Sequence, residues 1–173
     1  MSFEMIHFRE SDKIIRQKRL DRDVKITLNY LSDVLQGTLQ RGELLRQALD
    51  EMGWRENGSL NILEGRRYQY KGFKKGVALE GSFAAYEYLW AGLLRLLYGF
   101  DKKLINTGVL MLTAERSEKS TLGTSCDLVL TEVELLCPTI SLPVTVALFD
   151  LEEPVISDEE GGDVSGLSVP EIE

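Results

Sequence analysis

The chain has 173 residues, of which 43% are hydrophobic and 28% charged, and its formal net charge is −8. This length and composition are typical of one globular domain with its own hydrophobic core. No apolar run approaches the ~20 residues of a membrane span, and the first residues form no signal-peptide core. We therefore expect an intracellular, cytoplasmic protein that contacts no membrane.

The negative charge is concentrated at the C-terminal end. Residues 152–173 hold 8 of the 28 acidic residues and none of the 20 basic ones, so residues 1–151 have no net charge. We expect residues 1–151 to form a single domain. Residues 152–173 combine scattered acids with little periodicity, so we expect them to form an acidic, disordered tail. The acidity of the whole chain therefore does not exclude nucleic acid as a partner of the body.

The cysteine and histidine content argues against two classes of site. Cys126 and Cys137 form no CxxC motif, and His7 is the only histidine. Zinc sites and Cys-His nucleophiles need such partners. We interpret both cysteines as small apolar residues of a helix and its end.

Basic residues crowd the N-terminal segment that follows Met1–Phe8, itself compatible with a short strand or an irregular lead-in. Two interpretations of the run stay open, a solvated helix face and a rim that contacts phosphates. The cations are Lys13, Arg16, Lys18, Arg19, Arg22 and Lys25.

Apolar residues then recur at helical spacing in two successive segments. The first segment predicts an amphipathic helix over Asp21–Gln36, broken by Gly37, and the second predicts a helix that stops at Gly53. The positions that carry the pattern are Val24, Leu28, Leu31 and Leu35, and then Leu44, Leu45, Ala48, Leu49 and Met52.

Strand patterns begin after the turn signal Asn57-Gly58. Leu60 and Ile62 suggest one strand and Tyr68–Phe73 another. The residues Lys74-Lys75-Gly76 then turn the chain into a further strand. The sequence thus predicts a hairpin in the middle of the chain.

The second hairpin strand, Val77–Phe83, is apolar except for Glu80 and Ser82 near its end. An unpaired carboxylate costs free energy to desolvate. We therefore expect Glu80 either to belong to a functional site or to pair with a cation of its own hairpin, such as Arg66 or Arg67.

Helices and strands alternate in the remaining sequence. A helix that contains Tyr86 is predicted to end at Gly99. The run Thr107–Thr113 is apolar nearly throughout, as in a strand buried on both faces. After a polar loop, Ser125–Leu136 predicts a helix and Pro143–Leu151 a last strand. This order predicts an α/β fold, a mixed β-sheet flanked by α-helices, with an N-terminal helical segment.

Residues Gly53–Leu151 resemble the PD-(D/E)XK nuclease superfamily and, within it, the BglII/BstYI-type restriction endonucleases. The resemblance lies in the order of the hairpin RRYQYKGFKKGVALEGSF, the helix AAYEYLWAGLLRLLYG and the strands TGVLMLT and PVTVALFDL. It implies a restriction-endonuclease-like fold, Mg²⁺-dependent hydrolysis of phosphodiester bonds, double-stranded DNA as partner and a homodimer.

The active-site motif of that family is degenerate in this chain. Its second-strand glutamate corresponds to Glu80, the expected metal ligand and catalytic residue. Gln69 and Tyr70 stand where the family has an aspartate, and Ser82 stands at the third motif position. Because Mg²⁺ is usually held by one or two carboxylates, a relocated acid would have to join Glu80, and Glu64 is our candidate. Other acids close in sequence are Asp50, Glu51 and Glu87.

Two functions stay open at this point. One is a Mg²⁺-dependent, type II-like DNA endonuclease, and the other is a catalytically inactive relative that binds DNA or a protein partner, or serves as a dimeric subunit. In the second case the acidic tail would cover a basic face or act as an interaction arm. The candidate phosphate contacts are Lys13, Arg16, Lys18, Arg19, Arg22, Lys71, Lys74, Lys75, Arg116 and Lys119.

Overall fold

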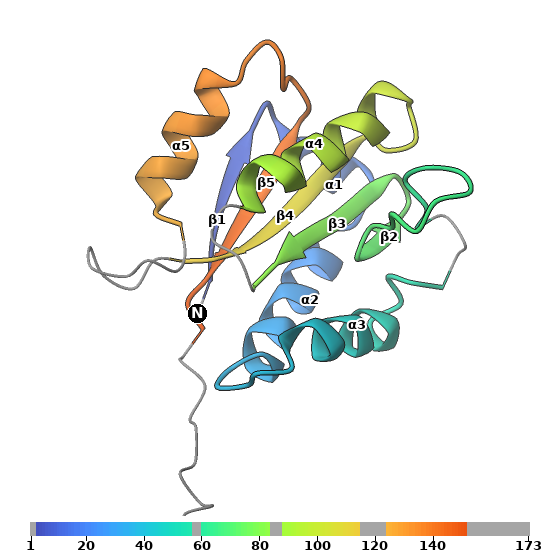
Figure 1. The fold of residues 1–173 in the computed structure, drawn as a ribbon, viewed down its shortest axis with the longest axis vertical. Helices are drawn as coiled ribbons and strands as arrows, with labels where there is room; N and C mark the ends of the chain where they lie inside the picture. Colours follow the sequence, from blue (N-terminus) through green and yellow to red (C-terminus); the bar gives the residue numbers. More distant parts are fainter. Residues whose placement is uncertain (1–2, 57–59, 84–87, 115–123, 152–173) are drawn as a thin grey trace, which may run out of the picture.

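A five-stranded sheet runs through the middle of the protein, with helices on both of its faces (Figure 1). The computed structural model describes residues 3–56, 60–83, 88–114 and 124–151. The strands are β1 (Phe3–Phe8), β2 (Gly72–Lys74), β3 (Val77–Ser82), β4 (Thr107–Thr113) and β5 (Val144–Phe149). The helices are α1 (Ser11–Gln17), α2 (Asp21–Val34), α3 (Arg41–Glu51), α4 (Tyr88–Asp101) and α5 (Cys126–Leu135). No helix in these ranges is both long and apolar enough to cross a membrane.

The strand order β1-β5-β4-β3-β2 gives a mixed sheet. Strands β3, β4 and β5 are parallel, whereas β1 pairs antiparallel with β5 and β2 pairs antiparallel with β3. All of β5, and all of β4 except Thr113, is buried, as expected for central parallel strands covered on both faces. The predicted α/β architecture is confirmed, and Met1–Phe8 contains an edge strand.

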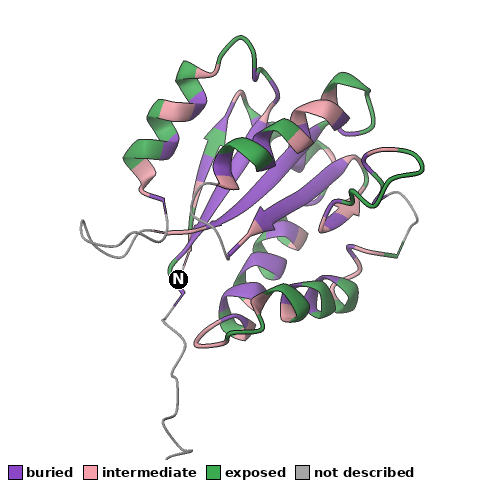
Figure 2. Cartoon of the chain, in the orientation of Figure 1, coloured by how far each residue is buried: buried purple, intermediate pink, exposed green. Residues whose placement is uncertain are grey.

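Alternate side chains of the sheet point into two hydrophobic cores. On one face, Ala78 and Leu110 pack with α4 and α5, and on the other, Leu79 and Val109 pack with α1, α2 and α3. Figure 2 shows the central strands buried along most of their length and the helices exposed on their outer sides. Glu80, two residues after Ala78, therefore belongs to the face that α4 covers.

The hairpin turn forms as predicted, but its first strand is much shorter than expected. Lys75 and Gly76 both have positive φ, at 49° and 84°, the backbone of a two-residue turn that suits a β-hairpin. The strand predicted over Tyr68–Phe73 is wrong in its start, since β2 comprises only Gly72–Lys74. The pairing with β3 stops at Lys71, whose N donates to Leu79 O at 2.9 Å, because Tyr70 N donates to Leu60 O at 2.8 Å instead of to β3.

Helix α4 continues past Gly99 to Asp101, so the predicted helix end at Gly99 is wrong. Gly99 instead provides space inside the helix. A Cβ atom at this position would overlap the hydroxyl of Tyr70. Tyr70 is 1% exposed, and its hydroxyl donates to the backbone oxygen of Arg95 at 3.3 Å. The glycine thus lets a buried phenol insert beneath the helix.

We predict that Gly99→Ala lowers the free energy of unfolding by up to about 2 kcal/mol, because overpacking costs ~1–3 kcal/mol and the gain in helix propensity returns only about 1 kcal/mol of it. Urea denaturation measures the change. Tyr70→Phe, which removes the overlapping oxygen, should rescue most of it.

Gly42→Ala is the matched control, because a Cβ at Gly42 of α3 meets no atom within 4 Å. We expect that substitution to be neutral or stabilising. Equal losses for Gly42→Ala and Gly99→Ala would contradict the packing explanation.

Candidate functional site

Glu80 is the fourth residue of β3, and its side chain is fully buried with 0% exposure. The neighbouring backbone supplies one partner, since Gly81 N donates to Glu80 Oε1 at 3.0 Å. The other carboxylate oxygen, Oε2, is buried and has no hydrogen-bond partner among the described residues. Burying a carboxylate in this way is costly unless charged or polar groups compensate it.

Helix α4 supplies the compensating groups from two positions seven residues apart. The Tyr88 hydroxyl donates to Glu80 Oε1 at 3.0 Å, and Arg95 Nη1 lies 3.4 Å from the same oxygen. Arg95 Nη1 also donates to the Tyr88 hydroxyl at 2.6 Å. A spacing of seven is close to two helical turns, so both side chains project from one side of α4. Glu80 therefore pairs with the helix that follows, and not with Arg66 or Arg67 of its own hairpin.

Burial dominates the protonation of this site. Loss of solvent raises the pKa of Glu80 above its usual value, and the Gly81 amide, the Arg95 charge, the Tyr88 hydrogen bond and the Lys71 charge each lower it, but not enough to reverse the rise. The protein environment thus offsets part of the desolvation penalty of one carboxylate.

Tyr70 fills the position where the resemblance implies an aspartate. Burial raises the pKa of Tyr70 to about 12, with the Glu80 charge as a further cause. The group is therefore a neutral phenol near pH 7 and supplies no negative charge. Gln69 is exposed and its amide donates to Asn61 Oδ1 at 2.9 Å, so it is held by the adjoining loop.

The other predicted site residues are dispersed. Ser82 is half-buried at the end of β3, and Glu64 is exposed at a turn. Asp50 lies 3.2 Å from the guanidinium of Arg55, and Glu51 accepts a hydrogen bond from Tyr30. Glu87 falls outside the described residues.

These donors do not fit the Mg²⁺ ion that the resemblance implies. Mg²⁺ is usually held by one or two carboxylates together with waters and phosphate oxygens. Among the described residues, no group of three or more His, Cys, Asp or Glu side chains could hold a metal. Instead of a second carboxylate, Glu80 has a positively charged partner, because the Arg95 guanidinium lies beside it.

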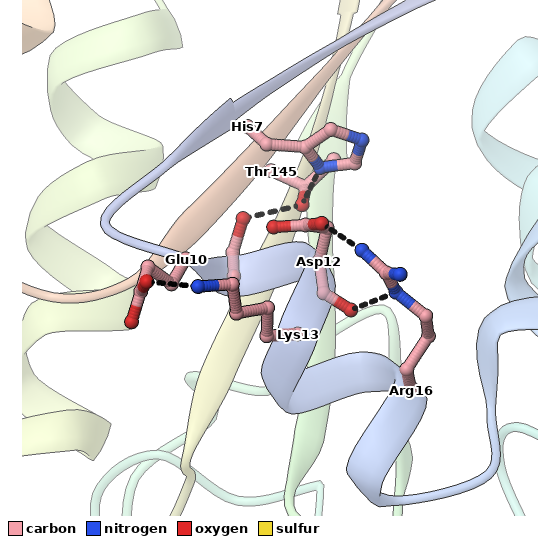
Figure 3. A network of polar contacts seen from close by, with 7 residues as sticks. His7, Glu10, Asp12, Lys13, Arg16 and Thr145 are labelled. Carbon is pink, nitrogen blue, oxygen red and sulfur yellow. Dashed lines mark hydrogen bonds and ion pairs between the residues drawn. The ribbon is translucent and has the colours of Figure 1, made fainter.

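Acidic neighbours neutralise two of the predicted phosphate contacts in the basic run. Figure 3 shows Lys13 paired with Glu10 and Arg16 paired with Asp12. Both pairs lie on the surface, within one turn of helix, where such pairs contribute little to stability. Each pair cancels the positive charge of a side chain that is a candidate contact for DNA phosphates.

A chain of polar side chains in the same view holds the start of α1 to the sheet (Figure 3). Ser11 Oγ donates to Val144 O at 3.1 Å and lies 2.8 Å from the Thr145 hydroxyl, which in turn lies 2.8 Å from His7 Nδ1. Because Ser11 has one hydroxyl proton, Thr145 donates to it and accepts from His7 Nδ1. Burial lowers the pKa of His7. We interpret this cluster as structural.

Most of the remaining candidate phosphate contacts lie within the described residues. Lys74 pairs with Asp23 at 3.1 Å. Lys18 lies beside the hairpin turn, since its Nζ is 3.6 Å from the position of a Cβ on Gly76. Lys71, near Glu80, is close enough to influence the pKa of that acid. Arg116 and Lys119 fall outside the described residues. Within the described part of the chain, the cations that form no ion pair include Lys18, Arg19, Arg22, Lys71 and Lys75.

Comparison with known proteins identifies the fold. No protein-family model matches the sequence, and no curated protein does. The crystal structure of restriction endonuclease BglII complexed with a DNA 16-mer matches with a TM-score of 0.64 and 12% identity, covering 88% of this chain and 77% of that chain. Free BglII matches with a TM-score of 0.57 and 13% identity, covering 86% of this chain and 79% of that chain.

The chain has a BglII-like restriction-endonuclease fold. The resemblance stated from the sequence is confirmed at the level of the fold. At identities of 12% and 13%, the structural similarity establishes the fold and not the function. Within the restriction-endonuclease fold, sequence reasoning located Glu80 but missed Tyr88 and Arg95. The available signal was two polar residues seven positions apart in an otherwise apolar helix.

We predict that Arg95→Leu lowers the free energy of unfolding by roughly 3 kcal/mol at neutral pH, because it leaves a buried carboxylate without its charged partner. Urea denaturation of the wild type and the variant measures this. In a Glu80→Gln background the same substitution should cost much less. Equal costs in both backgrounds would contradict the ion pair.

The pH dependence of stability should follow from the raised pKa of Glu80. The stability that the raised pKa confers is fully present below the usual value of 4.5 and is lost as pH rises through the higher pKa of the folded state. Arg95→Leu should extend this loss to higher pH, and Glu80→Gln should remove it. An identical pH profile for the wild type and Glu80→Gln would contradict the assignment.

Proposed function

We propose that this protein is a catalytically inactive relative of the restriction endonucleases that binds double-stranded DNA. The fold supports the proposal, and one of the two neighbouring structures is BglII complexed with a DNA 16-mer. The neutral charge of residues 1–151 also permits DNA binding, because the negative charge of the chain resides in residues 152–173.

The observation that carries the proposal is the pairing of Glu80 with Arg95. Metal-assisted hydrolysis of a phosphodiester depends on a cation held by protein carboxylates. Here the expected aspartate position carries Tyr70, and the guanidinium of Arg95 lies 3.4 Å from Glu80. The described residues thus supply one acid that already has a counter-charge. We infer that Glu80 stabilises the junction between β3 and α4.

One observation favours the alternative, a Mg²⁺-dependent endonuclease. Glu80 Oε2 is buried without a hydrogen-bond partner among the described residues, and native proteins rarely leave a buried polar atom unsatisfied. A cation would satisfy it. A second carboxylate would then have to come from the segments outside the described ranges, which contain Glu87.

We expect DNA binding to involve a dimer, as the resemblance implies. Large apolar side chains stay exposed on the outer sides of α4 and α5, including Trp90 at 56%, Leu94 at 63% and Leu135 at 75%. The two helices are neighbours, because Trp90 Nε1 donates to Glu132 Oε2 at 3.1 Å. Exposed apolar clusters favour protein–protein contact. The outer sides of α4 and α5 are therefore our candidate interface.

We predict that the protein binds a labelled DNA duplex in fluorescence anisotropy and that its affinity falls as KCl is raised, with a slope of about −0.9 for each phosphate contacted. Supercoiled plasmid should stay intact with Mg²⁺ or Mn²⁺, both for the wild type and for Glu80→Gln. Cutting by the wild type alone would establish the endonuclease alternative. The absence of duplex binding at low salt would contradict the proposal.

We predict that Leu94→Glu shifts the protein from dimer to monomer in sedimentation velocity, because a charge in an apolar contact is costly. Ile26→Glu is the control, since Ile26 is an exposed apolar residue of α2 at 44% exposure. A monomeric wild type, or a dimer that only Ile26→Glu disrupts, would contradict an interface on α4 and α5.

A further inference from the structure

Cations from three connecting segments gather where β3 and β4 begin. The segments are the link between α1 and α2, the hairpin turn and the loop after α4, and Figure 1 shows the last two at one end of the sheet. They meet at Gly76, since Asn106 N donates to Gly76 O at 2.7 Å and Lys18 Nζ lies 3.6 Å from the Cβ position of Gly76. We call their cations, all exposed except the half-buried Lys18, the basic cluster: Lys18, Arg19, Lys75, Lys102 and Lys103.

The charge of the basic cluster is not balanced by ion pairs. The segments that carry it, residues 18–20, 75–76 and 102–106, include no acid. Asp21 and Asp101 adjoin them in sequence, but neither forms an ion pair with a cation of the cluster. Among the described residues, no other acid pairs with the cluster either. Its positive charge is therefore accessible to a negatively charged partner.

The backbone of the turns does not account for these cations. Arg19, Lys75 and Lys103 have φ of 59°, 49° and 59°, in the left-handed region. That region costs free energy for any residue other than glycine, so glycine would relieve each turn. Strained positions of this kind often coincide with functional ones. The three turns thus carry positive side chains in spite of their backbone geometry.

One segment of the chain has the complementary charge. Residues 152–173 hold 8 acids and no base, whereas residues 115–123 hold two of each. The acids of residues 152–173 are densest at residues 158–163, which we call the acidic segment and which contains four acids in six residues: Asp158, Glu159, Glu160 and Asp163.

The acidic segment is long enough in reach to meet the basic cluster. Leu151 follows β5 at the end of the sheet opposite the cluster, because β3, β4 and β5 are parallel. The path covers the six residues of β3, about 20 Å, and two strand spacings, about 10 Å. Residues 152–163 extend over up to about 40 Å, which exceeds that path.

We propose that the basic cluster binds the acidic segment of its own chain and that this contact withholds the cluster from DNA phosphates. Opposite charge supplies the attraction. The connection through Leu151 supplies a high effective concentration, on the order of millimolar for a flexible link. The docking itself does not depend on DNA binding, whereas the competition rests on the proposed function.

The docking is tested with a spin label beside the acidic segment. Ser165→Cys carries a nitroxide in the full chain, with Cys126 and Cys137 both replaced by serine. The amide resonances of Gly76 and Asn106 in the cluster should broaden at about 50 mM KCl. Most of this broadening should disappear at about 500 mM KCl, because salt screens the attraction.

Two variants of the labelled chain separate the cluster from general charge. Lys75→Gln with Lys103→Gln should lose at least about half of the broadening. Arg46→Glu, at an exposed position of α3, changes the net charge by the same amount and should keep it. Equal broadening in the wild type and the cluster variant, or none in the wild type, would overturn the docking. Broadening seen only between spin-labelled ¹⁴N chains and unlabelled ¹⁵N chains would assign the contact to a second copy and overturn docking within one chain.

The competition is tested by anisotropy with a labelled DNA duplex. One full-length variant has amides in place of the four acids of the acidic segment. The control has amides in place of four other acids of residues 152–173: Glu152, Glu153, Glu171 and Glu173. The first variant should bind at least about threefold more tightly than the control, because the intramolecular competitor is lost. Equal affinities would overturn the competition. The absence of duplex binding by every variant would overturn the proposed function and leave the docking to the spin-label result.

Discussion

The buried ion pair between Glu80 and Arg95 is the constraint on which the arrangement around it depends. A carboxylate with 0% exposure needs a partner charge, and Arg95 of α4 provides it at 3.4 Å. Tyr88 joins the pair from the same side of the helix. The position of α4 over β3 then fixes what can lie beneath it, and Gly99 leaves room there for the Tyr70 hydroxyl. Charge, hydrogen bonding and packing thus all favour one placement of the helix.

In this protein the fold is that of a restriction endonuclease, but the site around Glu80 differs from the metal centre that the resemblance implies. The topology is that of BglII, yet the described residues around Glu80 form an internal ion pair where the resemblance implies a metal centre. Replacing an external cation by a protein guanidinium keeps the local charge balanced while it removes the need for a second acid. We propose that the restriction-endonuclease fold persists here as a DNA-binding module, since its sheet and helices do not depend on catalysis.

The sequence predicted most of what local pattern controls. Thr107–Thr113 is apolar nearly throughout, which indicates a central strand, and Lys75-Gly76 indicates the turn of the hairpin. Partners distant in the chain were not predictable in this way: the pairing of Glu80 with Arg95 depends on how α4 crosses the sheet. The local pair of Arg16 with Asp12 was accessible, because the two residues are four apart on one helix. The start of β2 was placed too early because Tyr70 N donates to Leu60 O of the preceding loop, so the pairing with β3 begins only at Lys71.

The most direct test of the central claim is a titration of the Glu80 side-chain carboxyl carbon by ¹³C NMR, with and without Mg²⁺, in the wild type and in Arg95→Leu. If Arg95 is the counter-charge, the wild-type resonance will not respond to Mg²⁺, and the pKa of Glu80 will be higher in Arg95→Leu. A Mg²⁺-dependent shift of that resonance in the wild type, with a pKa that Arg95→Leu leaves unchanged, would contradict it.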